Sequence, residues 1–269
     1  MDLLVVAAFL LVAALEILVP LGIAFWLSRR TGISKKVFAY GAAFFVLVQV
    51  FHIPLIQFTQ VPFAEFLRGM GLEQPFLLLV FSAYAGLLAG LFEEIGRCLV
   101  FVKFFPRKKI KPDRKNAVML GLGWGGIESI AVAVLVAFAL LAYLSAAPLT
   151  AGQISDINAA YGGSLTAEEV QSMQEQIEQL MNLNPLHVLL GLAERLMAIT
   201  LHVAWTLMVL TAVLQRKKLW LFLAVLWHSA VDAVAVFVAT NYGAVQAELA
   251  VFVFFLLGVF YIYFKWKGE

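Results

Sequence analysis

Residues 77–100 read LLLVFSAYAGLLAGLFEEIGRCLV, an apolar run that is interrupted by two adjacent glutamates, Glu93 and Glu94, and one arginine, Arg97. About 20 apolar residues suffice for a helix to cross the hydrocarbon core of a bilayer. An ionised side chain at the centre of such a helix costs roughly 2.5–3.5 kcal/mol, so it needs a partner or a function. The run therefore predicts a membrane-spanning helix that carries part of a buried site.

The composition of the whole chain agrees with this interpretation. Of its 269 residues 63% are hydrophobic and 13% charged, and the mean hydropathy is +0.93. A soluble chain is typically about 45–50% apolar and 25% charged. We therefore expect an all-α, polytopic transmembrane bundle that forms a single domain over residues 1–269. Seven apolar runs are long enough to span: roughly 3–28, 37–58, 75–102, 116–146, 186–214, 219–239 and 247–264.

The basic residues predict the orientation of the bundle. Sixteen of the 19 Lys and Arg fall in the first, third and fifth loops and in the C-terminal tail. By the positive-inside rule, the N-terminus is expected outside and the C-terminus in the cytoplasm, in a bacterial plasma membrane. The extracytoplasmic loop 147–185 carries acids instead of bases. Within it, Thr166-x-x-Glu169 is typical of a capping box and predicts an amphipathic helix, either a lid over the site or a plain surface helix.

Six ionisable residues interrupt four of the apolar runs. Counted from the cytoplasmic end of each helix at 1.5 Å per residue, one residue on each of the four helices lies about 15–21 Å deep, near the middle of the bilayer: Glu93, Glu128, His202 and His228. One such residue could be a structural hydrogen bond between helices. Six in one layer favour a common buried site, formed by Glu93, Glu94, Glu128, His202, His228 and Asp232.

Local spacing adds detail to this site. Arg97 lies three and four residues after the glutamate pair, so its guanidinium can pair with either carboxylate. The other acid would then be free to act as a base. His228 and Asp232 are spaced i,i+4, which would let the carboxylate orient the imidazole or contact substrate.

Other polar and small residues have weaker interpretations. Arg195 lies on nearly the same face as His202 and could supply positive charge above the site, and Glu194 ranks below the main set. Single polar residues on the first two helices are expected to have structural roles: Glu16, Gln49 and His52. Two small-residue pairs with GxxxG spacing are expected to draw the two acid-bearing helices together: Gly86 with Gly90, and Gly121 with Gly125.

The ordered set of motifs resembles a known family. Glu93-Glu94-x-x-Arg97, Gly121-x-Gly-x-Gly-Gly-x-Glu128, His202 and His228-x-x-x-Asp232 are similar to the YhfC-type intramembrane metalloproteases. The motif order is also similar to that of the PrsW and CAAX-protease (ABI) groups. CAAX-type enzymes have three residues between the glutamate pair and the arginine, and this chain has two, which favours the YhfC side. YhfC relatives often have a histidine at the position of Trp124.

The resemblance implies a hydrolytic centre. In this hypothesis a divalent metal, with zinc preferred, is held by Glu128, His202 and His228, because two histidines and a carboxylate form a known catalytic zinc set. Glu93 takes the proton of the attacking water, which is expected to reach the site from the cytoplasmic side, and Glu94 pairs with Arg97. The oxyanion is stabilised by the metal or, in a metal-free glutamate-type variant, by His228 with Asp232.

Two other classes of protein stay open. Acids and histidines at the membrane midplane are also found in ion- or proton-coupled transporters, although the chain shows no inverted repeat. A non-catalytic membrane scaffold of the same fold is the other alternative. As partners we expect a membrane-protein or peptide substrate and the lipid bilayer, and no nucleic acid.

Overall fold

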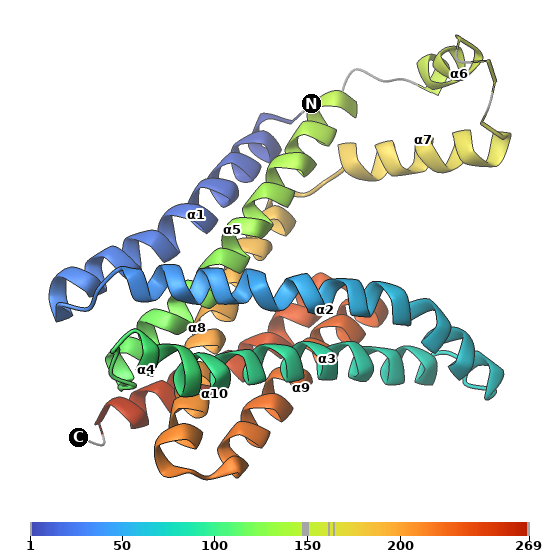
Figure 1. Cartoon of the computed structure of the whole chain (residues 1–269). Helices are drawn as coiled ribbons and strands as arrows, with labels where there is room; N and C mark the ends of the chain where they lie inside the picture. The colour runs from blue at the N-terminus through green and yellow to red at the C-terminus, as the bar shows by residue number, and fades with distance from the viewer. Residues whose placement is uncertain (1, 147–150, 161, 164, 268–269) are drawn as a thin grey trace.

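The computed structural model describes residues 2–146, 151–160, 162–163 and 165–267, and the regular elements in this part of the chain are all helices (Figure 1). Residues 147–150, which begin the predicted extracytoplasmic loop, lie outside the described residues. The elements are α1 (Leu3–Thr31), α2 (Lys36–Gly69), α3 (Phe76–Leu99), η1 (Val100–Phe104), α4 (Phe105–Arg107), α5 (Arg114–Ala146), α6 (Ala151–Ala160), α7 (Ala167–Met181), α8 (Pro185–Gln215), α9 (Lys218–Tyr242) and α10 (Ala244–Lys267).

The seven predicted spans are confirmed. Seven helical stretches of the described chain are long and apolar enough to cross a membrane, and α3, η1 and α4 together form one of them. The all-α transmembrane bundle predicted from composition is therefore the observed fold class. Local signals set several helix ends: the Asp2 carboxylate caps the start of α1, and Gly32 ends it in a left-handed conformation with φ 74°. Asn184 caps α8 just before Pro185, in the first helical position.

Helix α8 is the centre of the bundle. In its most apolar 18-residue stretch 78% of the residues are buried, against 11–33% for the other six spans. It packs on α1, α5, α9 and α10, and every residue from 201 to 212 is buried. A residue near the middle of α8 is therefore surrounded by protein, whereas most other helices keep one face for lipid.

The main apolar core lies at the end of the bundle that carries the basic loops. Toward the opposite end, α1 and α5 diverge from α2 and α3 (Figure 1). The core cluster includes Ala24 and Leu27 of α1, Val37 and Phe45 of α2, Val100 and Phe101 of η1, Ala117, Met119, Leu120, Leu122 and Trp124 of α5, and Val203, Leu207, Met208, Val209 and Leu210 of α8. The ionisable residues lie where this core ends.

Glycines mark the closest helix contacts, but the partner helices differ from the prediction. A Cβ added at Gly86 or Gly90 of α3 would collide with the backbone of α9 around Ser229. A Cβ at Gly121 of α5 would lie 2.8 Å from the Cα of Val203 on α8. The expectation that the glycines join the two acid-bearing helices is wrong, because each acid-bearing helix packs on a histidine-bearing helix instead.

Candidate functional site

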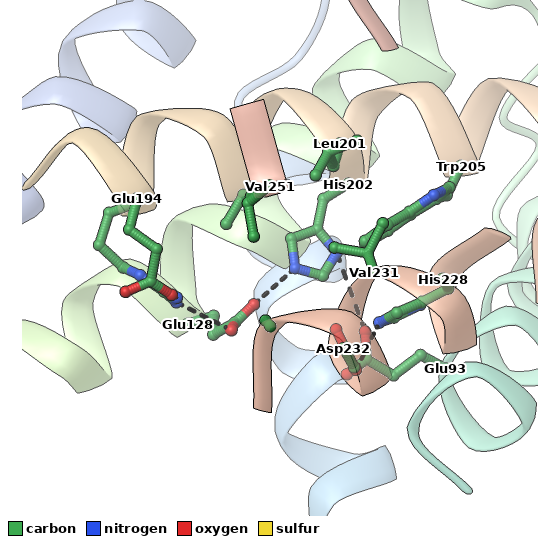
Figure 2. Close-up of a pocket in the computed structure, with 13 residues that line it drawn as sticks. Glu93, Glu128, Glu194, Leu201, His202, Trp205, His228, Val231, Asp232 and Val251 are labelled. Atoms are coloured by element: carbon green, nitrogen blue, oxygen red, sulfur yellow. Dashed lines mark hydrogen bonds and ion pairs between the residues drawn. The ribbon is translucent and has the colours of Figure 1, made fainter. Parts of the chain in front are cut away.

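Five of the six predicted site residues line one cavity of about 100 Å³ (Figure 2). The helices supply them as the depth count predicts: one from α3, one from α5, one from α8 and two from α9. They are Glu93, Glu128, His202, His228 and Asp232. The sixth, Glu94, is completely buried behind this wall.

A buried guanidinium joins the acids and one histidine. Arg97 has no exposed surface, and its Nη2 lies 3.1 Å from Oε2 of Glu93 and 2.5 Å from Nδ1 of His202. Its Nη1 donates to Oε1 of Glu94. The sequence predicts pairing with one acid and a second acid left free; the structure corrects this, because Arg97 contacts both. A fork-shaped, always-charged donor group suits such multiple pairing.

Glu93 is fixed by donors from three helices. Its Oε1 accepts a hydrogen bond from Nε2 of Gln49 on α2 at 3.0 Å. Its Oε2 accepts one from the indole Nε1 of Trp124 on α5 at 2.8 Å, and one from Arg97 on its own helix. Such hydrogen bonds hold the carboxylate in one orientation.

The contacts of His202 define its tautomer. A guanidinium only donates hydrogen bonds, so Nδ1 of His202 facing Arg97 has to accept, and the ring proton is on Nε2. That Nε2 lies 2.5 Å from Oε2 of Glu128. The other oxygen of Glu128 accepts from Nη1 of Arg195 at 2.9 Å, and Arg195 also pairs with Glu194. The expected positive charge near the site is thus present and is neutralised by carboxylates.

His228 lies between two carboxylates. Its Nδ1 is 2.7 Å from Oε1 of Glu94, and its Nε2 is 3.5 Å from Oδ2 of Asp232, the residue one turn further along α9. The ring stacks on Trp205 of α8, with the centroids 3.9 Å apart and the planes at 8°. Stacking and hydrogen bonds therefore hold the imidazole so that one edge faces the cavity.

The predicted zinc ligands, Glu128, His202 and His228, are residue types that bind zinc, but their arrangement does not form a zinc site. In the described part of the chain no three His, Cys, Asp or Glu are grouped so that they could hold a metal ion. Both ring nitrogens of His202 and of His228 already face a protein partner. The predicted set of Glu128, His202 and His228 therefore does not form a metal site in this arrangement.

Three side chains contribute to the site without being predicted to do so from the sequence. Gln49 and His52 are expected to be structural, yet Gln49 contacts Glu93, and Nδ1 of His52 lies 3.0 Å from Oε1 of Gln49. Their signal in the sequence is their spacing of three residues on an otherwise apolar helix. Trp124 is the third, and nothing in the sequence indicates that its indole N–H donates to Glu93. Glu16 is buried on α1, beside Ser129, and does not line the cavity.

Fold and site together define a helical membrane protein with a buried Glu–Arg–His centre. Residues 15–255 match the YhfC intramembrane metalloprotease family, and the chain belongs to that family. It is 29% identical over 228 residues to the membrane protein YhfC of Bacillus subtilis (strain 168), covering 83% of this chain and 81% of the relative. No solved structure matches the chain significantly.

Proposed function

We propose that the chain hydrolyses peptide bonds of membrane-embedded or membrane-adjacent polypeptides, in a bacterial plasma membrane, with Glu93 as the base. The family description supports the class of reaction. The observation that carries the proposal is the unequal placement of the two adjacent glutamates. Glu94 is sealed between Arg97 and His228, whereas Glu93 lies on the cavity wall, next to the space that water can enter.

The protein groups can be assigned to the steps of hydrolysis. The Glu93 carboxylate takes one proton from a water molecule whose oxygen attacks the peptide carbonyl carbon. The N–H on Nε2 of His202 and the N–H of His228 that faces Asp232 stabilise the oxyanion that forms, and each exchanges its present carboxylate partner for the oxyanion in this step. When the C–N bond breaks, Glu93 passes its proton to the leaving amine and is again a carboxylate. Arg97, Gln49 and Trp124 keep its oxygens in place throughout.

Zinc held by Glu128, His202 and His228, the set predicted from the sequence, is favoured by the family description but not by the arrangement of these residues. Binding would require His202 to exchange a present partner for the ion. We therefore expect purified protein to contain well under one zinc per chain by elemental mass spectrometry. About one zinc per chain, lost in folded His202→Ala and His228→Ala variants, would contradict this expectation and establish the predicted metal centre.

The hydrolysis itself is tested by mass spectrometry of new N-termini in the membrane fraction of a bacterial host. The compared variants are wild type, Glu93→Gln and Glu65→Gln, the last an exposed glutamate of α2 that serves as the matched control. We expect membrane-protein cleavages that wild type and Glu65→Gln share and Glu93→Gln lacks. The same cleavages with Glu93→Gln, at equal protein level, would remove Glu93 from the role of base.

A further inference from the structure

The cavity around Glu93 extends in one direction only. On α8 its lining runs from Trp205 back to Glu194, and on α9 it runs from His228 forward to Ala235. Both directions lead away from the basic loops, because α8 ends and α9 begins at the basic fifth loop. Val251, near the start of α10, completes the rim.

Side-chain exposure rises in the same direction. The deepest lining groups are nearly closed off: the side chain of Glu93 is 7% exposed, that of His202 4% and that of His228 3%. Those nearer the rim are open, with 37% for Asp232 and 39% for Glu194. A gradient of this kind is expected when solvent reaches a site from one side.

The opposite end is closed by the main core. Every residue of α8 from 201 to 212 is buried, so no path runs along this helix toward the basic loops. Val100 and Phe101 of η1 and Phe105 of α4 are at most 1% exposed, and they fill the end of the bundle below Arg97. Because the basic loops are expected in the cytoplasm, the closed end is the cytoplasmic one, and the packing there argues against the expected entry of water from that side.

We propose that water and substrate reach Glu93 from the end opposite the basic loops, through a mouth between α8, α9 and α10. The part of this inference that concerns a substrate rests on the proposed function, and it restricts the class of polypeptide that can be cleaved. The polypeptide that is cleaved presents its scissile segment from the extracytoplasmic half of the membrane. A segment held in the cytoplasmic half would meet the packed core instead.

Thiol labelling tests the route without any assay of hydrolysis. The single native cysteine, Cys98, is replaced by alanine, and one cysteine is introduced at the mouth, as Ala198→Cys on α8 or Ala235→Cys on α9. Matched controls on the same two helices are Ala204→Cys and Ala224→Cys, at positions with no exposed surface. Two exposed positions report the side of the membrane: Ser172→Cys on α7 and Lys111→Cys in the basic third loop.

Each variant is treated with the small cationic, membrane-impermeant reagent MTSET, in intact cells and in inside-out vesicles, after size-exclusion chromatography has confirmed its fold. We expect the two mouth cysteines to react from the side that labels Ser172→Cys, at least about tenfold faster than the buried controls, because accessible thiols react preferentially. Labelling from the side of Lys111→Cys, or at the rate of the buried controls, would overturn the route. Failure of the Glu93→Gln test alone would leave it standing, since labelling does not depend on hydrolysis.

Discussion

The indole nitrogen of Trp124 lies 2.8 Å from Oε2 of Glu93, and this hydrogen bond joins α5 to α3 at the centre of the site. The same indole ring lies under the guanidinium of Arg97, whose Cζ is 4.5 Å from the ring centroid. Trp124 is fully buried and packs its ring against Phe45 as well. One side chain therefore positions the candidate base and also covers the cation that pairs with it.

Replacing Trp124 by phenylalanine should remove the hydrogen bond and keep most of the ring packing. Hydrogen bonds to charged groups contribute about 1.5–3 kcal/mol, so we expect a loss of that size in the free energy of unfolding. The measurement is equilibrium unfolding by SDS in mixed micelles. Trp26→Phe, at a position 59% exposed on α1, is the control and should leave the free energy nearly unchanged. Equal stability of the two variants would contradict a structural use of the indole N–H.

Arg97 should be required for the stability of the fold, because its removal leaves two buried carboxylates without their cation. Breaking a buried ion pair from one side costs about 3–5 kcal/mol, and we expect Arg97→Met to lose stability in that range. Adding Glu94→Gln to Arg97→Met removes one of the uncompensated charges and should restore part of the loss.

The same micelle unfolding assay measures Arg97→Met, Glu94→Gln and the double variant. The control is Arg68→Met, at an exposed position near the end of α2, with an expected change within about 0.5 kcal/mol. If the double variant is less stable than Arg97→Met by the full effect of Glu94→Gln, the two side chains are not coupled and the described ion pair does not contribute.

The layer of site residues could be predicted because helix geometry fixes depth. A rise of 1.5 Å per residue and a bilayer of known thickness place Glu93, Glu128, His202 and His228 at one level, whatever the packing. Which helix touches which could not be predicted in this way. A glycine pair indicates that some helix approaches closely, but it does not identify that helix. The glycines of α3 therefore predict close packing on α5, whereas the structure has α3 packed on α9.

The contacts between polar side chains could not be predicted from the sequence, for a related reason. Gln49 on α2 looks the same in the sequence whether its amide faces another helix or the candidate base. Its contact with Glu93 depends on how α2 packs against α3. The same limit applies to the predicted metal ligands. Their residue types fit zinc, but in the folded chain His202 contacts Arg97 and Glu128.

Gly125 should be intolerant of a side chain because His202 lies against it. An added Cβ would be 2.8 Å from Cδ2 of His202 and 3.0 Å from the Cα of Ile199. Overpacking of this kind costs about 1–3 kcal/mol, and we expect Gly125→Ala to lose that much stability and to displace the imidazole. Gly191→Ala, on α8 with open space around it, is the matched control and should stay within about 1 kcal/mol of wild type. A stable Gly125→Ala with unchanged histidine NMR signals would contradict the described contact.

The stability of the first turn of α7 should depend on pH through one carboxylate outside the membrane, that of Glu169. Oε2 of Glu169 accepts hydrogen bonds from the backbone N–H of Thr166 at 2.7 Å and from its hydroxyl at 2.9 Å, and the Thr166 hydroxyl in turn accepts from the N–H of Glu169. These bonds hold the pKa of Glu169 below its ordinary value of 4.5. Because the folded pKa is the lower one, the capping box stabilises α7 above pH 4.5, and its contribution is lost as the pH falls through the folded pKa.

Hydrogen exchange measures this loss directly at the first turn of α7. In wild type, protection factors corrected for intrinsic exchange rates should be lower at a pH below 4.5 than at a pH well above it, since protonation weakens the Glu169 carboxylate as an acceptor. In Glu169→Gln the decline should disappear, because the amide does not titrate. Glu175→Gln, an exposed substitution later in the same helix, keeps the capping box and should retain the decline. A wild-type first turn that is equally protected at both pH values would show that the ionised Glu169 does not stabilise the start of α7.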